Sequence, residues 1–246
     1  MSHLAGPIFT VVVAGGSGRR FGSMKQFERL DSAGGGTRVL DHAVRTALEC
    51  CDGVVLVVPA DDVDDERAHH DRARVEVVAG GPTRTASTRC GLAAVPDTAT
   101  VILVHDAARP FASVELFRSV IDAVADGVDG AVPGLPVTDT VKSIEVVPTT
   151  TVPGLGAATH RPAVTPVVTA TPDRATLVAV QTPQAFRADV LRRAHRQENE
   201  GSDDASLVEV IGGTVIVVPG EPDNRKITHP EDLAWAREHL ARKASS

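Results

Sequence analysis

Ile8-Phe9-Thr10-Val11-Val12-Val13 is an apolar, β-branched run, and it is followed by Ala14-Gly15-Gly16-Ser17-Gly18-Arg19-Arg20-Phe21-Gly22 and then by Lys25. The run predicts a buried strand. The glycines allow backbone N–H groups to approach an anion closely, and the basic side chains after them can neutralise phosphates. The segment therefore indicates a triphosphate-binding loop. Taken alone, it also fits a tight strand-to-helix turn with solvated basic residues.

Two better-known phosphate loops fit less well. The chain contains no Gly-Lys pair followed by Ser or Thr, which a P-loop requires. A dinucleotide fingerprint can start at Gly16 and Gly18, but Phe21 occupies its third glycine position. Both alternatives are therefore disfavoured.

Composition predicts one soluble, cytoplasmic domain spanning residues 1–246. Hydrophobic residues make up 42% of the chain and charged residues 23%, and the net charge is −7. The acidic balance argues against a nucleic acid polymer as partner. No apolar stretch reaches the ~20 residues that span a bilayer, so we expect no membrane association. Cys50, Cys51 and Cys90 lack metal-ligand spacing and fit a reducing compartment.

Apolar strands alternate with helical patterns along the chain. This alternation predicts the α/β class: a Rossmann-like, mostly parallel sheet with helices on both faces. The predicted strands are Ile8–Val13, Val54–Val58, Val75–Val78, Thr100–Val104 and Thr214–Val218. The predicted helices lie near Val39–Glu49, Asp62–Asp71, Thr85–Ala94, Val114–Ala125, Arg187–Glu198 and Glu231–Ala241.

One segment interrupts the alternation. Residues 133–172 hold seven of the sixteen prolines and no helical pattern. We expect a protruding β-arm at about 137–174, with Val137–Val147 and Ala163–Thr171 as antiparallel strands. A lone two-stranded ribbon is marginal in water, so the arm favours a homodimer. A mobile insertion without a partner remains the alternative.

Polar clusters follow the predicted strands, where parallel sheets bind ligands. Gly80-Gly81 precedes Arg84 and Ser87 at a helix start, which suits the oxygens of a ribose or base, although an ordinary capped loop also fits. Asp106 and Arg109 can bind a magnesium–phosphate complex or a sugar hydroxyl, or they can pair with each other. His105 is interpreted as a local hydrogen-bonding residue.

Three further clusters are weaker alone: Asp139–Lys142, Ser202–Ser206 and Asp223–Thr228. Paired aspartates before a helix also serve as a cap, and Lys226 can be a solvated lysine. Together the clusters place cations beside strand ends, at Arg20, Lys25, Arg84, Arg109 and Lys226. Such a concentration of positive charge suggests that two phosphorylated reactants neutralise it.

The order of these motifs resembles the 2-C-methyl-D-erythritol 4-phosphate cytidylyltransferase family, from about Ile8 to Leu240. The most specific stretches are His105–Arg109, Asp203–Ser206 and Asn224–Thr228. The resemblance implies transfer of CMP from CTP to 2-C-methyl-D-erythritol 4-phosphate in non-mevalonate isoprenoid biosynthesis, by a homodimer using Mg²⁺ bound mainly through the CTP phosphates. The metal ligands in the protein stay unknown.

The resemblance also implies roles for individual residues. It implies triphosphate binding by Arg20 and Lys25 and acceptor binding by Lys226. Our hypothesis for the mechanism makes these three residues catalytic: Lys25 and Lys226 stabilise charge on the α-phosphate, and Arg20 holds the leaving pyrophosphate. The implied nucleotide-binding residues are Ala14, Gly15, Gly16, Gly18, Gly81, Arg84, Ser87 and Ala107. The implied substrate-binding residues are Asp106, Arg109, Thr140, Arg174, Ser202 and Asp223, with Arg174 reaching across from the other subunit's arm.

Two alternative functions stay open at this point. A ribitol-5-phosphate cytidylyltransferase shares the fold and the Ala-Gly-Gly loop. A non-catalytic nucleotide sensor would bind CTP without turnover, although a sensor has no need of the lysine pair. The Asp-Asp-Ala-Ser run and the Asp173-Arg174 pair favour the methylerythritol acceptor.

Overall fold

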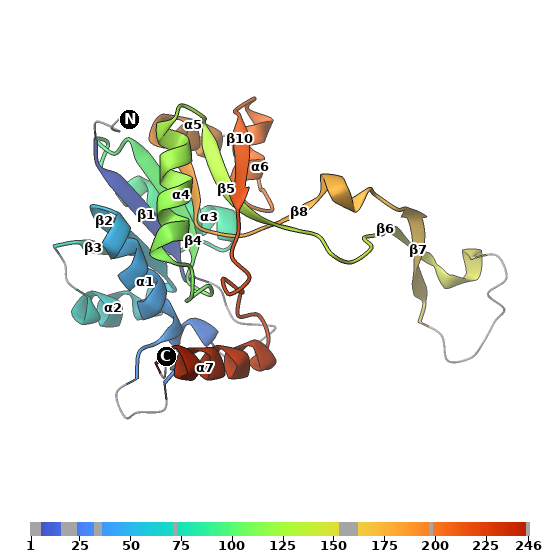
Figure 1. Ribbon diagram of the computed structural model, residues 1–246, viewed down its shortest axis with the longest axis horizontal. Coiled ribbons are helices and arrows are strands. Elements are labelled where there is room, and N and C mark those ends of the chain that lie inside the picture. Colours follow the sequence, from blue (N-terminus) through green and yellow to red (C-terminus); the bar gives the residue numbers. More distant parts are fainter. Residues whose placement is uncertain are drawn as a thin grey trace. The chain divides into compact units, whose positions relative to one another are not determined.

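The computed structural model describes residues 6–15, 24–31, 36–70, 73–152, 162–196 and 199–244. The chain divides into two compact units. Met1–Gly134 and Val180–Ser246 form the first unit, and Leu135–Ala179 form the second. The excursion expected at residues 137–174 falls within the second unit, and the elements of both units are labelled in Figure 1.

The first unit is built on a mainly parallel sheet with the strand order β10-β5-β9-β4-β1-β2-β3. β9 runs antiparallel to both of its neighbours, β4 and β5, and β8 pairs with β5. The strands are β1 (Ile8–Val13), β2 (Gly53–Val58), β3 (Val75–Ala79), β4 (Val101–Asp106), β5 (Gly130–Pro136), β8 (Val178–Val180), β9 (Gln184–Arg187) and β10 (Val215–Pro219). The boundary between the two units falls within β5 and within β8.

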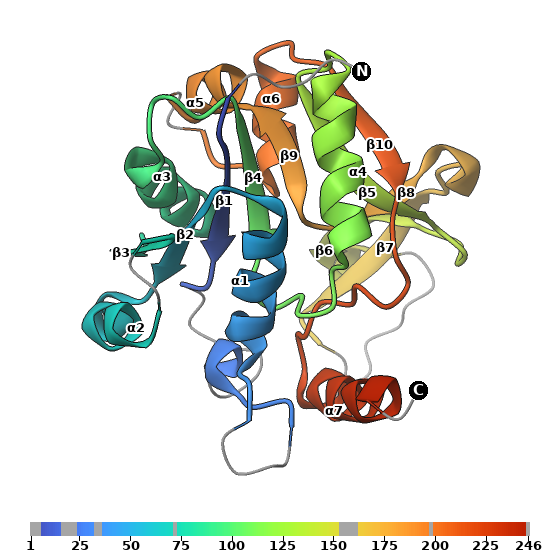
Figure 2. The same ribbon diagram turned by 60° about the vertical axis from the view of Figure 1, so that its left-hand side comes forward.

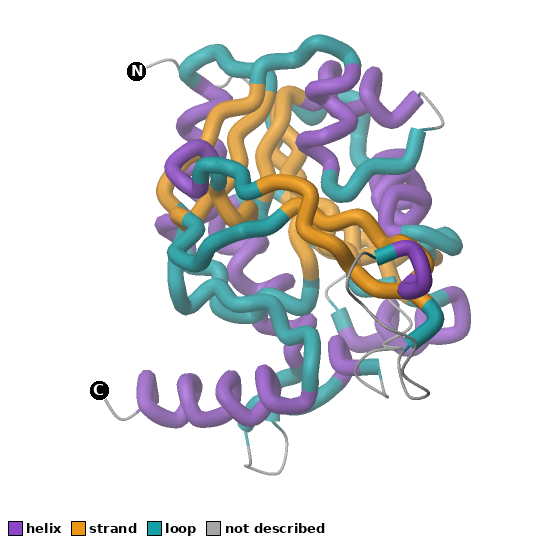
Figure 3. The backbone as a smooth tube through the Cα atoms, turned by 90° about the vertical axis from the view of Figure 1, so that its right-hand side faces the viewer, coloured by secondary structure: helices purple, strands orange, loops and turns teal. Residues whose placement is uncertain are grey.

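Helices cover both faces of this sheet, so its central strands are buried and mostly apolar. β2 and β4 are buried at all six of their positions, as expected for strands covered on both sides. The helices are α1 (Val39–Cys50), α2 (Val63–His69), α3 (Arg84–Ala94), α4 (Val114–Ala125), α5 (Ala188–Arg196), α6 (Asp204–Val210) and α7 (Pro230–Ala244). Figure 3 shows these helices around the orange strands.

The period-two alternation of the strands separates two hydrophobic clusters. Val12 faces the cluster that contains Leu40 of α1 and Phe117 of α4. Val11 faces the other cluster, with Leu92 of α3 and Leu191 of α5. Figure 2 shows α1 and α4 together on one face of the sheet. Each face of the sheet is thus packed against its helices by a cluster of its own.

A third cluster attaches α7 to the loop that follows β10. Phe111 and Ile227 pack with Leu233 of α7, and Trp235 packs against this cluster from its edge. The guanidinium of Arg225 lies over the Trp235 ring, 4.5 Å from its centroid. The segment around Lys226 is therefore anchored on both sides of that lysine.

The second unit contains a two-stranded antiparallel sheet of β6 (Ser143–Pro148) and β7 (Val164–Ala170). Apolar side chains of both strands are exposed, with 56% exposure at Ile144 and at Val168. The pairing of two strands here matches the sequence prediction, but the first strand starts at Ser143 rather than Val137.

The α/β class predicted from the sequence is confirmed, and five parallel strands begin within about one residue of their predicted starts. The sequence prediction missed β5, β8, β9 and α6. β8 has three residues and β9 four, too few to show a period, and α6 has seven. β5 contains Pro133 and Gly134, which read as loop residues.

Within the described residues, no helix combines the length and apolar character that crossing a bilayer requires.

Gly91 tests the contact between α3 and the sheet. A Cβ atom on Gly91 would lie 2.4 Å from Val11 Cγ1 and 2.9 Å from Val57 Cγ2. We expect Gly91→Val to lower the free energy of unfolding by about 2–3 kcal/mol, because overpacking forces the sheet and helix apart. Urea denaturation measures this change. Ala93→Val is the control, since Ala93 is exposed on the same helix and should cost less than about 1 kcal/mol. Equal losses would contradict the contact.

Candidate active site

The carboxyl ends of four neighbouring strands form one edge of the sheet. Val13 at the end of β1 is in register with Asp106 at the end of β4 and with Val57 of β2. Val58 of β2 pairs with Ala79 at the end of β3. The loops that leave these strands therefore begin at the same level, so the motifs predicted at strand ends converge.

Two of the glycine-containing loops meet at Ser87, in the first turn of α3. The Gly81 N–H donates to Ser87 Oγ, and the Ser87 hydroxyl donates to the Gly81 carbonyl, both at 3.2 Å. A Cβ atom on Gly15 would lie 3.2 Å from the same Oγ. The structure thus brings together the predicted nucleotide-binding residues Ala14, Gly15, Gly81 and Ser87. Gly16, Gly18 and Arg20 lie outside the described residues.

Asp106 is the centre of the charged part of the site. Its Oδ2 accepts from Lys226 Nζ at 2.6 Å, and its Oδ1 accepts from Arg84 Nε at 3.3 Å. Burial disfavours the charged carboxylate, but Arg84 and Lys226 outweigh it and hold the pKa of Asp106 well below its usual value. Asp106 is therefore a carboxylate fixed between two cations.

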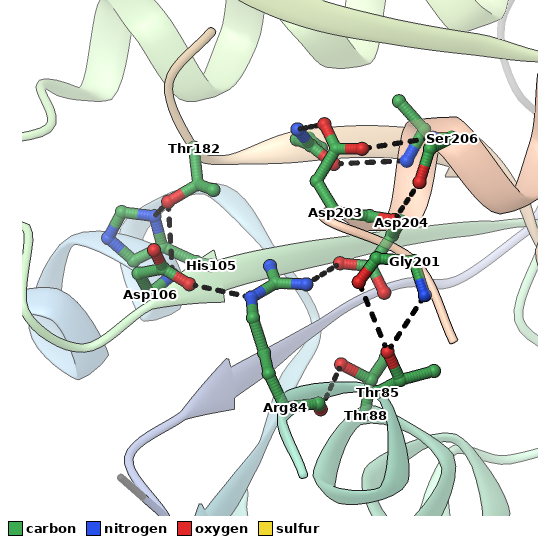
Figure 4. A network of polar contacts seen from close by, with 12 residues as sticks. Arg84, Thr85, Thr88, His105, Asp106, Thr182, Gly201, Asp203, Asp204 and Ser206 are labelled. Atoms are coloured by element: carbon green, nitrogen blue, oxygen red, sulfur yellow. Dashed lines mark hydrogen bonds and ion pairs between the residues drawn. The ribbon is translucent and has the colours of Figure 1, made fainter. Parts of the chain in front are cut away.

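Arg84 links Asp106 to a second buried carboxylate. Its NH1 donates to Asp204 Oδ2 at 2.8 Å, and His195 Nε2 lies 3.1 Å from Asp204 Oδ1. Burial opposes the charge on Asp204 also, yet His195 and Arg84 lower its pKa. Figure 4 shows the Arg84 side chain between Asp106 and Asp204. The four charges of Lys226, Asp106, Arg84 and Asp204 balance one another.

This balance differs from the sequence prediction. We expected the positive charge at the strand ends to be neutralised by phosphorylated reactants. In the structure Asp106 and Asp204 already neutralise Arg84 and Lys226. Nor is Asp106 ion-paired with Arg109, the structural alternative left open by the sequence. Arg109 NH1 instead donates to the Asn224 carbonyl at 2.7 Å.

The loop after β10 brings the two predicted catalytic lysines to the same place. Lys25 begins the short 3₁₀ helix η1 (Lys25–Phe27), and its Nζ donates to the Ile227 carbonyl at 2.5 Å. Ile227 N in turn donates to the Ala108 carbonyl at 2.8 Å. Lys25 therefore contacts the residue next to Lys226, and the same loop touches the segment that holds Asp106.

His105 supports Asp106 from within the sheet. The Thr182 hydroxyl accepts from the Asp106 N–H at 3.0 Å and lies 3.1 Å from His105 Nδ1, and His105 Nε2 lies 3.2 Å from the Arg109 carbonyl. These partners favour a neutral ring with its proton on Nε2. Burial lowers the pKa of His105 to about 4. This agrees with the local hydrogen-bonding role expected from the sequence.

The remaining predicted residues have other surroundings. Ser202 is exposed, and the Asp223 carboxylate lies 3.8 Å from His239 Nε2 of α7. Thr140 and Arg174 belong to the second unit, where Arg174 NH1 donates to the Thr138 carbonyl at 2.7 Å. Ala107, predicted for the nucleotide, is buried directly after β4.

The sequence prediction missed Asp204, His195 and Thr182 as members of the site. It interpreted the two aspartates as a helix cap, which is correct for Asp203 alone: its Oδ1 accepts from Ser206 N at 3.0 Å. No local feature of the sequence separates Asp204 from Asp203, so this role had no signal to reveal it. Within the described ranges no group of three or more His, Cys, Asp or Glu side chains could hold a metal ion.

A family model described as 2-C-methyl-D-erythritol 4-phosphate cytidylyltransferase matches residues 8–242, a range that includes every residue of the network above. The chain belongs to this cytidylyltransferase family. The cytidylyltransferase from Streptomyces avermitilis is 42% identical over 244 residues, covering 95% of this chain and 91% of the relative. The one from Rhodococcus jostii is 42% identical over 240 residues, covering 96% of each.

Solved structures of cytidylyltransferases carry the same fold. The 4-diphosphocytidyl-2C-methyl-D-erythritol synthase from Anaerococcus prevotii superposes with a TM-score of 0.75 at 30% identity, covering 96% of this chain and 99% of that structure. The cytidylyltransferase from Thermus thermophilus gives a TM-score of 0.68 at 32% identity, covering 94% and 98%. The family resemblance drawn from the motifs is confirmed.

The buried ring of His105 predicts a pH dependence of stability. Its folded pKa of about 4 lies below the ordinary value of 6.5, so the unfolded chain binds the proton first as the pH falls. The contribution of the neutral ring is complete above pH 6.5 and is lost progressively down to about pH 4. We expect the stability difference between wild type and His105→Gln to shrink over this range in urea denaturation.

His42 and His239, whose pKa values burial also lowers, titrate in both proteins and cancel in that difference. A difference that stays constant between pH 7 and pH 4 would contradict the neutral, buried ring.

Proposed function

We infer that this chain transfers CMP from CTP to 2-C-methyl-D-erythritol 4-phosphate and releases pyrophosphate, the reaction for which its relatives are named. The observation that carries the inference is the family match over residues 8–242, together with the convergence of Lys25, Asp106 and Lys226 within it. The reaction belongs to non-mevalonate isoprenoid biosynthesis.

The chemistry is a direct displacement. A phosphate oxygen of the acceptor attacks the α-phosphorus of CTP, the bond to the β-phosphate oxygen breaks, and pyrophosphate leaves with the bonding electron pair. The acceptor phosphate is already an anion at neutral pH, so no general base is needed. Catalysis then consists of positioning and charge stabilisation.

The lysines supply the charge stabilisation in this proposal. Lys25 and Lys226 flank the α-phosphate and stabilise the negative charge that it gains in the transition state. Lys226 is suited to this role, since its side chain is 40% exposed while its ammonium is held at Asp106. It can move from the carboxylate to a phosphate by rotations of its own side chain. Arg20 is proposed to hold the leaving pyrophosphate.

The nucleotide is proposed to bind where the two glycine loops meet. We propose Ala14, Gly15, Gly16 and Gly18 as binding residues for the triphosphate, and Gly81, Arg84, Ser87 and Ala107 as binding residues for the cytidine. Free backbone N–H groups at the start of α3 favour this arrangement. The contacts of Ser87 with Gly81 support it, because they hold the second glycine loop against the first turn of α3.

The acceptor is proposed to lie on the other side of Asp106. Arg109 suits its phosphate: the Arg109 Nε is buried and has no hydrogen-bond partner among the described residues, although NH1 is bonded. Ser202, Asp223 and Thr140 are proposed as further contacts. Arg174 would reach this site from the other subunit of a homodimer that forms through the β-arm, where the exposed apolar side chains of β6 and β7 favour a partner.

Mg²⁺ is proposed as the cofactor, bound mainly through the CTP phosphates. Asp106 is the carboxylate nearest to this role, but both of its oxygens are engaged by Lys226 and Arg84. A metal that keeps water and phosphate oxygens as ligands suits such a site, because it needs few protein carboxylates. When bound, it would neutralise charge on the leaving pyrophosphate. A cytoplasmic location also belongs to this proposal.

The lysine roles predict a large loss of turnover. Lys25→Ala and Lys226→Ala should each lower kcat by about 10²–10³-fold, because each removes one preorganised donor to the transition state. Pyrophosphate release from CTP measures the effect, and circular dichroism checks the fold. Lys243→Ala is the control: Lys243 is an exposed lysine in the last turn of α7. Full turnover in either site variant would refute its role.

The acceptor is tested by direct comparison. We expect pyrophosphate release from CTP with 2-C-methyl-D-erythritol 4-phosphate, and at least about tenfold lower kcat/KM with ribitol 5-phosphate, since a misplaced acceptor phosphate loses its alignment. A preference for ribitol 5-phosphate would replace the proposed acceptor. CTP binding without turnover of either would favour the sensor.

A further inference from the structure

Arg84 is held from two sides by carboxylates that differ in their surroundings. Asp106 stands at the open end of β4 and also binds Lys226, whereas Asp204 is only 1% exposed and starts α6. The Arg84–Asp204 contact of 2.8 Å is shorter than the Arg84–Asp106 contact of 3.3 Å. Asp204 is therefore the firmer of the two attachments of the guanidinium.

Asp204 is itself fixed by His195 of α5. The Nε2–H of His195 donates to Asp204 Oδ1, and His195 is 6% exposed. The two oxygens of Asp204 thus have separate partners, one on α5 and one on α3. A buried carboxylate with both oxygens engaged keeps one rotamer, so it holds its partner in one place.

This arrangement leaves one edge of Arg84 available to a ligand. Nε and NH1 have carboxylate partners, while NH2 has no hydrogen-bond partner among the residues that the structure describes. The positive charge is compensated by the protein on both sides (Figure 4). An arginine in this state acts as an oriented donor toward an uncharged acceptor rather than as a free charge.

We propose that Asp204 and His195 are positioning residues for nucleotide binding: they orient Arg84 so that its free edge faces the cytidine. This proposal rests on the proposed function, in which Arg84 contacts the nucleotide. Asp204 and His195 need not touch the ligand. They act through the guanidinium. Without them, Arg84 is free to turn toward Asp106, the carboxylate that also binds Lys226.

Calorimetric titration with CTP tests the proposal. Asp204→Asn keeps the size of the side chain and removes its charge, and it should raise the Kd for CTP about tenfold, the scale of a lost supporting contact. Asp204→Glu should recover part of this affinity, because the charge returns. His195→Phe should weaken CTP binding in the same direction but less. In the steady state the KM for CTP should rise more than kcat falls.

Asp203→Asn is the matched control. Asp203 is the adjacent carboxylate, and its contacts are with Ser206 and Gln184, not with Arg84. Asparagine also caps helices well, so this variant should keep the wild-type Kd. A double-mutant cycle completes the test: in an Arg84→Ala background, Asp204→Asn should cause no further loss of CTP affinity, because the residue through which it acts is gone.

The outcomes separate this proposal from the proposed function. The positioning role would be overturned by wild-type CTP affinity in Asp204→Asn, or by full additivity of this variant with Arg84→Ala, even if turnover were normal. An absence of CTP binding by the wild type would also overturn it. A lower melting temperature with unchanged Kd would assign Asp204 to stability alone. If Asp204→Asn fails to fold, Asp204→Glu and His195→Phe carry the cycle. If methylerythritol phosphate is not turned over, the proposed function fails, while the CTP cycle still tests Arg84.

Discussion

The ion pairs around Asp106 join parts of the chain that only the fold brings together. β4 ends at Asp106, α3 begins with Arg84, and Lys226 follows β10 more than a hundred residues later. A carboxylate with so little exposure is tolerated only when it is paired, so its two cations must be in place in the folded protein. Folding therefore requires Arg84 and Lys226 to meet Asp106 at the strand ends, and the same contacts assemble the proposed active site.

Much of this arrangement could be read from the sequence, because its signals are local. The runs Ile8–Val13 and Val114–Ala125 coincide with β1 and α4 residue for residue. The rule that parallel strands bind ligands at their carboxyl ends then places Lys25, Arg84, Asp106 and Lys226 at one edge without coordinates. The order of these motifs along the chain resembles that of the cytidylyltransferase family, and this resemblance predicted the reaction.

What the sequence could not supply were pairings between distant residues. Nothing local distinguishes Asp204, which meets Arg84, from Asp203, which caps α6. Thr182 is separated from His105 by 77 positions. The sequence does not distinguish a neutral histidine at a strand end from any other histidine. β9 escaped detection because four residues cannot display a period. Long-range partners depend on topology, and the antiparallel insertion of β9 between β4 and β5 was not predictable from periodicity.

The anchoring of α7 affects Lys226 through the residues on either side of that lysine. Arg225 stacks on Trp235 and Ile227 is buried in the third cluster, so the residues on both sides of Lys226 are bound to the C-terminal helix or its neighbours. Folding already fixes the backbone at Lys226, so a ligand that binds there has only the side-chain rotations left to restrict. In the proposed reaction, α7 therefore reduces the order that a substrate must still impose on Lys226.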